Sequence, residues 1–420
     1  MITHNKNQFK DLQRLILALG LMLIIYMAAL AVMMNKELLV DEYTHYHQII
    51  NFRDKNFYVL EDLTTIPGYH LVMAVVSLAI NHDSIRFFRV VNGFFGIASS
   101  VIFLSLFKEI NHHISVERLI QYSLLPILFP FHFLIYTDTL SLLLVLSGIY
   151  LALEKRFNLS GFVLFLSLLV RQNNIIWLFL AFIIYCLDFC ANKLRANKSR
   201  SLSQLNFLGG GLIFILGIIF FGVFVYINRG VALGDKLMHP GNELNPGNIF
   251  FFLFLYFFLF LPSILKMLFD LSNKRKIGKS TYLYLLGLLV SLYLIYMFKF
   301  DVVHPYNVEW QDYFLRNKLL GFMVSSPLSK TLYFIPMGLS VIHIYQRSIS
   351  SPQLLLLFCL IAIFLMPSSL IEQRYYIIPF SLLIATFPVE NRSIEIITCI
   401  LYLALSSIFV FLINSGRFFL

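Results

Sequence analysis

Two adjacent carboxylates, Asp41 and Glu42, follow directly on the first apolar run of the chain. If that run spans a membrane, both side chains lie at its boundary, where desolvation raises the proton affinity of a carboxylate and makes it a better general base. A solvated helix end is the structural alternative. His45 follows in the same segment, but without a third placed carboxylate the segment does not make a metal site, and we expect no metal ion there.

Arginines, amides and further carboxylates border or interrupt several other apolar runs. They form four groups: Arg86, Arg89 and Asn92; Tyr136, Thr137 and Asp138; Arg171, Gln172, Asn173 and Asn174; and Glu372, Gln373 and Arg374. Charged groups at membrane depth are costly, so they are usually paired or line a functional cavity. The structural alternative for Arg171 is an ion pair with Asp138 or Asp41.

The composition indicates a polytopic membrane protein. Of the 420 residues, 59% are hydrophobic and only 13% are charged, against about 45–50% and 25% in soluble proteins. This composition excludes disordered, collagen-like and disulfide-rich classes. The four cysteines lie in or beside apolar runs, where a thiol behaves as a small hydrophobe, so we expect no disulfide.

The apolar runs predict an all-α fold of about 12–13 transmembrane helices. Eleven continuous runs are expected to span the membrane: residues 15–34, 87–107, 119–135, 140–153, 207–227, 249–269, 282–298, 332–345, 354–370, 377–387 and 396–413. The polar residues 171–174 divide a further run, 157–184, into two short helices that meet at a polar turn. Residues 67–81 are predicted as a helix at the membrane interface.

The distribution of Lys and Arg predicts the orientation. With the N-terminus inside, the entire net charge of +10 falls on the cytoplasmic segments, as the positive-inside tendency expects. The excess of Lys and Arg therefore indicates how the chain is oriented in the membrane, and we expect no nucleic-acid partner. Residues 1–420 form a single membrane domain in this interpretation, with outer loops at 35–85, 228–248 and 301–329.

An outer membrane cavity that combines carboxylates with arginines suits the transfer of a sugar from a lipid phosphate. The donor is anionic at headgroup height, and its leaving phosphate needs cations as the glycosidic bond breaks. The acceptor hydroxyl needs a base. No metal or other cofactor is expected, because the leaving phosphate is already a stabilised anion.

Several short motifs in order resemble the dolichyl-phosphate-glucose α-1,2-glucosyltransferase family of the GT-C superfamily. They are Asp41-Glu42 with His45, Thr64 to Tyr69 (TTIPGY), Arg89 to Asn92 (RVVN), Tyr136-Thr137-Asp138, Arg171 to Trp177 (RQNNIIW), Gly234-Asp235-Lys236 with His239, Val303 to Tyr306 (VHPY) and Glu372 to Tyr376 (EQRYY). The resemblance covers about residues 40–380. Departures from the family pattern after His45 and at 309–313 leave the acceptor open.

The resemblance implies a helical membrane enzyme with an acidic first lumenal loop. It implies an inverting transfer of glucose from a polyprenyl or dolichyl phosphate to a lipid-linked or other glycan acceptor on the non-cytoplasmic face. The expected location is the endoplasmic reticulum membrane in a eukaryote and the cytoplasmic membrane in a bacterium.

From these motifs we predict the role of each site residue. Asp41 removes the acceptor proton, with Glu42 as the second candidate base. The donor phosphate is held by cations, namely Arg171, Lys236, His239, Arg89 and Arg374. The acceptor or sugar contacts are His45, Tyr69, Asp138, Gln172, Asn173 and Trp310, although aromatic residues in such a chain are more often membrane anchors or core.

Other functions fit some of the same residues. Another GT-C enzyme, such as a mannosyltransferase or a glycan ligase, would share the acidic loop. A transporter or flippase of lipid-linked sugars would also need a charged cavity. Transporters, however, usually show internal repeats and polar breaks near the midplane, whereas the polar groups here gather at one face.

Overall fold

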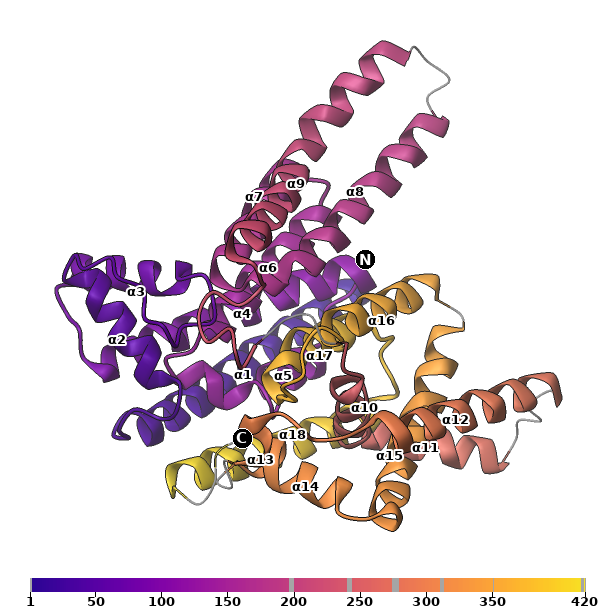
Figure 1. Ribbon diagram of the computed structural model, residues 1–420. Coiled ribbons are helices and arrows are strands. Elements are labelled where there is room, and N and C mark those ends of the chain that lie inside the picture. Colours follow the sequence, from indigo (N-terminus) through magenta and orange to yellow (C-terminus); the bar gives the residue numbers. More distant parts are fainter. Residues whose placement is uncertain are drawn as a thin grey trace. The chain divides into compact units, whose positions relative to one another are not determined.

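A computed structural model of the chain describes residues 2–195, 200–239, 244–273, 279–309, 313–349, 351–416 and 419, and helices joined by turns and loops make up these residues (Figure 1). The one extended pairing among them is an isolated bridge between Tyr313 and Phe419. The prediction of an all-α fold is confirmed.

Contacts divide the chain into two compact units. The first comprises residues 1–236 with 384–386, and the second comprises 237–383 with 387–420.

The first unit begins with the long helix α1 (Ile2–Met33) and continues into the predicted outer loop, which contains two helices. These are α2 (Glu42–Arg53) and α3 (Gly68–Ile80), followed by α4 (Ile85–Asn111). Side chains from α2, α3 and α4 share one hydrophobic cluster that includes Ile49, Tyr69, Met73 and Phe88. The helix predicted over 67–81 is therefore present as α3, and the outer loop is an ordered part of the unit.

The expected continuous span at 119–135 is wrong. The chain instead forms the short helix α5 (Val116–Ser123) and a 3₁₀ helix, η1 (Phe129–Phe133). Pro126 and Pro130 explain the interruption, because a proline lacks the backbone donor that a helix needs and clashes with the preceding turn.

The predicted break at residues 171–174 is confirmed, but only the first of the two helices is short, because the second has 21 residues. After α6 (Thr137–Leu153), helix α7 (Phe157–Val170) ends at Arg171, whose backbone is extended with φ −146° and ψ 114°. A 3₁₀ turn, η2 (Gln172–Asn174), then leads into α8 (Ile175–Arg195), and α9 (Arg200–Asn228) completes the unit. Helices that are consecutive in the sequence pack against each other, α7 on α6 and α9 on α8.

The second unit shows one further correction. The expected span 249–269 is two helices, Gly247–Leu259 and Leu261–Asp270, which meet at a bend of 78°. Pro262 lies in the first turn of the second helix and cannot donate back to the preceding one. These are α10 (Gly247–Leu259) and α11 (Leu261–Asn273).

The rest of the second unit combines long and short helices. They are α12 (Lys279–Lys299), α13 (Pro305–Val308), a π-helical turn η3 (Phe314–Lys318), α14 (Leu319–Val324), α15 (Pro327–Ser348), α16 (Pro352–Leu365), a 3₁₀ turn η4 (Gln373–Tyr376), α17 (Ile377–Thr386) and α18 (Arg392–Asn414).

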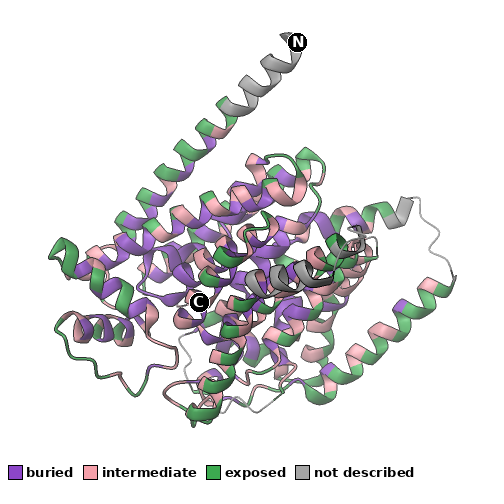
Figure 2. Ribbon diagram, turned by 90° about the horizontal axis from the view of Figure 1, so that it is seen from above, coloured by how far each residue is buried: buried purple, intermediate pink, exposed green. Residues whose placement is uncertain are grey.

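Six helices within the described ranges are long and apolar enough to cross a membrane, or seven if the bent pair counts as one span. They are Gln13–Met33, Ile85–Asn111, Gln172–Asn192, Gly210–Asn228, Ser280–Lys299 and Arg392–Asn414. Fewer helices meet this length than the 12–13 expected, because several predicted spans are apolar helices of 10–17 residues. Large apolar side chains on the long helices are exposed, for example Leu17 at 72% and Phe298 at 81%, as lipid contact requires. Along most helices buried and exposed residues alternate (Figure 2). The chain is a multi-pass membrane protein.

Candidate functional site

The most extensive polar contact in the first unit joins Arg89 of α4 to Glu42 at the start of α2. Arg89 Nε lies 3.0 Å from Glu42 Oε1, and Nη2 donates to Oε2. The remaining guanidinium hydrogens go to three backbone carbonyls, of Met33 (2.7 Å), Lys36 (2.8 Å) and Glu37 (2.9 Å). Both side chains are fully buried.

All the donors of Arg89 and all the acceptor positions of Glu42 are occupied. Besides Arg89, the carboxylate accepts from Leu39 N at 2.9 Å and from Ile135 N at 2.7 Å. Four donors saturate a carboxylate, and five acceptors saturate a guanidinium. The predicted roles of Glu42 as the second base and of Arg89 as a phosphate ligand stay predictions. In this structure, however, neither side chain has a hydrogen-bonding position left for a substrate.

Asp41 is the carboxylate next to this buried pair. It is half-buried, and its backbone begins α2, where its carbonyl accepts from His45 N at 3.0 Å. The same stretch contacts the chain just before α6, since Tyr136 OH donates to Leu39 O at 3.4 Å. Asp41 and the beginning of α6 therefore belong to the same neighbourhood of the first unit.

Asp138, in the first turn of α6, forms an ion pair with Arg171 at the break between α7 and α8. The Asp138 side chain is 2% exposed and that of Arg171 is 12% exposed. Among the described residues the second oxygen of Asp138 has no hydrogen-bond partner. The ion pair considered as the structural alternative for Arg171 is thus present, and a phosphate would have to approach a guanidinium that already has one anionic partner.

Gln172 joins its own motif to the motif at residues 64–69 and to the segment that precedes Gly234. Its side-chain oxygen accepts from Ile66 N at 3.3 Å, and its amide nitrogen donates to Thr64 O and Val231 O, both at 2.8 Å. Asn173, next in the turn, is half-buried. Predicted as a sugar contact, Gln172 is buried and occupied with backbone groups of the surrounding loops.

The segment 233–235 runs along the outer loop. Leu233, Gly234 and Asp235 donate backbone hydrogen bonds to the carbonyls of Thr64, Leu63 and Glu61, at 2.9, 2.9 and 3.0 Å. Gly234 is required for this approach, because a Cβ there would lie 2.0 Å from Glu61 O. Lys236 follows at an exposed position, with Nζ donating to Asn228 O at 2.7 Å.

Two predicted acceptor contacts, His45 and Tyr69, lie in the interior. His45 Nδ1 and His70 Nε2 are 2.9 Å apart and share a hydrogen bond. Tyr69 is fully buried, and its hydroxyl lies 3.4 Å from Asn92 Oδ1. Burial lowers the pKa of His70 well below its usual value, and the nearby charge of His45 lowers it further. Both roles stay predictions, although the structure places these rings in the packing of α2, α3 and α4.

The second unit holds the remaining predicted cations. The buried His304 accepts from Tyr306 N at its Nδ1 (3.1 Å), so its Nε2 carries the hydrogen and donates to Met238 O at 2.8 Å. The ring of His239 lies 5.8 Å from that of His304 and 6.1 Å from that of Tyr306. Both ring nitrogens of His304 are thus hydrogen-bonded, which fixes the ring next to that of His239.

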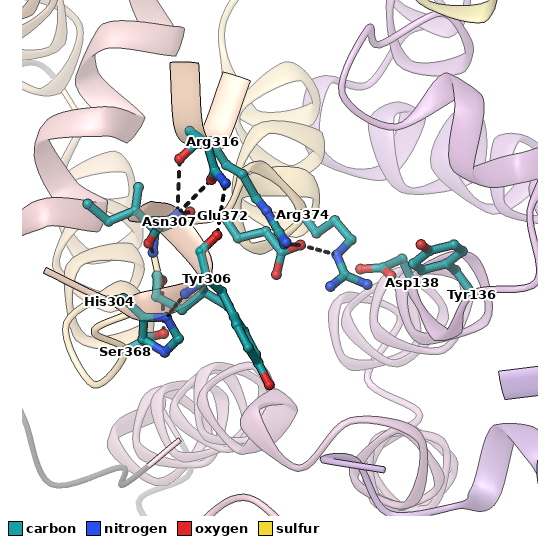
Figure 3. Close-up of polar contacts among 12 residues, drawn as sticks. Tyr136, Asp138, His304, Tyr306, Asn307, Arg316, Ser368, Glu372 and Arg374 are labelled. Atoms are coloured by element: carbon teal, nitrogen blue, oxygen red, sulfur yellow. Dashed lines mark hydrogen bonds and ion pairs between the residues drawn. The ribbon is translucent and has the colours of Figure 1, made fainter. Parts of the chain in front are cut away.

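Glu372 receives two arginines in the same unit. Arg316 Nη1 and Arg374 Nε lie 2.9 and 2.6 Å from Glu372 Oε1, and both guanidinium groups turn toward this carboxylate (Figure 3). Arg316 also stacks on Tyr313, with Cζ 3.9 Å from the ring centroid. The cluster carries one net positive charge, as an anion-binding site would require.

Asn307 supports this cluster and escaped the sequence analysis, as did Arg316. The Asn307 amide donates to Arg316 O (3.0 Å) and Ile371 O (2.9 Å) and accepts from Ile371 N (3.0 Å). A signal for Arg316 was available, because a lone arginine in the outer stretch 301–329 needs a carboxylate such as Glu372. Trp310, predicted to contact the acceptor, lies outside the described residues.

The first unit therefore holds the candidate base Asp41 with the cations Arg171 and Lys236, and the second unit holds His239 and the arginine pair at Glu372. The prediction that His239 and Arg374 act at the same site as Asp41 and Arg171 stays a prediction. No three His, Cys, Asp or Glu side chains gather within the described ranges in the way a metal site requires.

Comparison with known proteins places the chain among membrane glycosyltransferases. A relative from Candida albicans is 30% identical over 278 residues, which are 60% of this chain and 58% of that protein. Two human relatives are each 25% identical, with 90% of both chains covered. All three are named Dol-P-Glc:Glc(2)Man(9)GlcNAc(2)-PP-Dol alpha-1,2-glucosyltransferase.

Compared with solved structures, the chain has no significant match. A sequence model of the DIE2/ALG10 family, in contrast, matches residues 35–385, which include every predicted site residue. The chain belongs to the DIE2/ALG10 family.

Proposed function

We propose that this protein transfers glucose from dolichyl-phosphate glucose to a lipid-linked oligosaccharide and forms an α-1,2 linkage. The observation that carries the proposal is the match to this family over residues 35–385, together with relatives named for that activity and covered over 90% of their length. The multi-pass helical architecture suits a reaction between two lipid-linked substrates. The site of action is the lumenal face of the endoplasmic reticulum membrane.

Asp41 is the base in this proposal. The acceptor hydroxyl gives its proton to the Asp41 carboxylate while its oxygen forms a bond to C1 of glucose. The bond between C1 and the phosphate oxygen breaks at the opposite face, and the lipid phosphate leaves with the bonding electrons. A β-linked donor therefore yields an α-linked product. Glu42 does not serve as the base, because four donors already occupy its carboxylate.

Cations stabilise the departing phosphate. Arg171, Lys236, His239 and Arg374 are the proposed ligands, and each such preorganised contact is worth about 10²–10³ in turnover. The reaction needs no metal in this proposal, because a phosphate leaving group is stabilised by guanidinium groups as well as by a divalent ion. Undiminished activity in excess chelator is the expected result.

The test is product formation by the purified full chain. Incubation with dolichyl-phosphate glucose and the lipid-linked oligosaccharide that ends in two glucoses should yield an acceptor heavier by one hexose, detected by mass spectrometry. Dolichyl-phosphate mannose in a parallel reaction should yield nothing. Transfer of a hexose from dolichyl-phosphate mannose alone, or no product with either donor, would overturn the proposed specificity.

Asp41→Asn tests the assigned base. A positioned base contributes about 10²–10⁴ in rate, so turnover should fall by at least a hundredfold while the protein keeps its thermal stability. Asp54→Asn, at the exposed other end of α2, is the matched control and should keep full activity. Full turnover by Asp41→Asn would refute the assignment.

A further inference from the structure

A hollow lies where α1 ends and α4 begins, within the first unit. Its volume is about 730 Å³, and it is open on one side, which is in the range of small-molecule sites. The charged and polar residues that line it are Asn35, Lys36, Glu37, His82, Ser84 and Arg86. The apolar part of its lining comes from Met34, Ile85, Phe87 and Val90. None of these residues is part of the reaction proposed above.

Two cations in this hollow differ from the buried arginines of the protein. Arg89, Arg171, Arg316 and Arg374 each have a carboxylate partner. Among the described residues the side chains of Lys36 and Arg86 have none, although Glu37 lines the same hollow. Two unpaired cations beside one carboxylate leave an excess positive charge that an anionic ligand would neutralise.

The hollow is also held in shape by a buried group. Arg89 binds the backbone carbonyls of Lys36 and Glu37 at 2.8 and 2.9 Å. The segment that carries Lys36 is thus bound to α4. Arg86 is the second residue of that helix and lines the same hollow. Ser84 caps α4 by accepting from Phe87 N at 3.2 Å, and His82 Nε2 lies 3.0 Å from Ser84 Oγ. The positive end of the α4 dipole adds to the charge of the two cations.

We propose that this hollow binds the phosphate headgroup of a membrane lipid. Lys36 and Arg86 hold the phosphate oxygens. The apolar wall of Met34, Ile85, Phe87 and Val90 contacts the first carbons of the lipid chain. An apolar wall next to unpaired cations distinguishes a lipid phosphate from a free anion, which would gain nothing from the wall. The lipid is either a prenyl phosphate, which would extend the proposed function, or a phospholipid of the bilayer.

The experiment measures lipid retention by the purified full chain in a phosphate-free maltoside detergent. Native mass spectrometry counts the adducts formed with farnesyl phosphate in one arm and with phosphatidylglycerol in the other. Farnesol, which lacks the phosphate, is the ligand control. Lys36→Gln/Arg86→Gln removes both cations, and Lys55→Gln removes an exposed cation of the same loop as the matched control.

Retention of either lipid should weaken about tenfold or more in the double variant and stay unchanged in Lys55→Gln. The lipid whose retention falls in the double variant is the one that the hollow binds. The charge-preserving variant Lys36→Arg/Arg86→Lys should retain most of the binding, which separates loss of charge from misfolding. Equal retention by the wild type and the double variant, or equal binding of farnesol, would overturn the proposal. The binding readout is independent of turnover, so a failure of the transferase assay would not affect it.

Discussion

Arg89 encloses the carboxylate of Glu42, 47 residues earlier in the chain, and both side chains are fully excluded from solvent. The pair joins α4 to the start of α2, and the remaining donors of Arg89 bind the segment between α1 and α2. A guanidinium is suited to this role because its five donors lie in a fixed plane. The first outer loop is therefore fastened to the helices by a charged group and not only by apolar packing.

Glu42→Gln should destabilise the protein. The substitution leaves the Arg89 guanidinium buried without its counter-charge, which costs about 3–5 kcal/mol. Unfolding of the detergent-solubilised protein by heat or denaturant measures the loss. Asp83→Asn is the control, because the Arg53–Asp83 pair is half-exposed and such pairs contribute about 1 kcal/mol or less. A fully stable but inactive Glu42→Gln protein would instead make Glu42 the base.

Arg171→Gln should cost both stability and turnover, since it leaves the buried Asp138 carboxylate without its cation. Adding Asp138→Asn removes that unpaired charge and should restore most of the stability. Turnover should stay low in the double variant if the guanidinium also serves the phosphate. Recovery of turnover along with stability would show that Arg171 has a structural role only.

Glu372→Gln should destabilise the second unit, because Arg316 and Arg374 would face each other without the carboxylate that both contact. We expect a loss of about 3 kcal/mol or more, measured by denaturant unfolding. Replacing Arg316 by Met in the same chain should recover part of it. Glu309→Gln, at an exposed position nearby, should change nothing, and an equal effect at that position would contradict the explanation.

Stability should fall in mildly acidic solution because of His70. Burial holds its pKa well below the usual 6.5, so below pH 6.5 the unfolded chain takes up a proton that the folded protein does not bind. Each such proton lowers the free energy of unfolding by about 1.4 kcal/mol per pH unit. His70→Gln should show a shallower decline between pH 7.5 and 5.5. An unchanged slope would indicate that another group is responsible.

The orientation can be checked with glycosylation. The sequons at Asn158, Asn197 and Asn391 lie on the side assigned to the cytoplasm, so the protein expressed in eukaryotic cells should show no shift on a gel after deglycosylation. Tyr58→Thr converts the exposed Asn56 in the outer loop into a sequon and should introduce a shift. A glycan on the unmodified chain would reverse the assignment of the loop that carries it.

The fold class and the break at Arg171 could be predicted from sequence, since four consecutive polar residues cannot continue a lipid-facing helix. The interruptions near Pro126 and at Pro262 were missed because hydropathy is the same on both sides of each. A proline within an apolar run is the stronger signal for where a helix stops.

The candidate site was less accessible from sequence. Motif order singled out Arg89, Glu42 and Gln172, but it did not reveal that Arg89 and Glu42 pair with each other or that backbone groups of distant segments occupy their remaining positions and those of Gln172. Asn307 was missed because its partners are also mostly distant backbone groups. Tertiary contacts decide whether a charged side chain is fully paired within the protein or can still bind a ligand. Two arginines of α4 show the contrast, because Arg89 pairs with Glu42 whereas Arg86 has no carboxylate partner among the described residues.

The close approach at Gly234 limits how this protein can be labelled. Residues 61–64 and 233–235 are joined through main-chain atoms with no room for a single added methyl group. A fluorophore or affinity tag inserted there would separate these two segments. Residues 55–57 of the outer loop are exposed, and no described hydrogen bond joins them to a distant segment. A reporter group can therefore be inserted at this position of the outer loop.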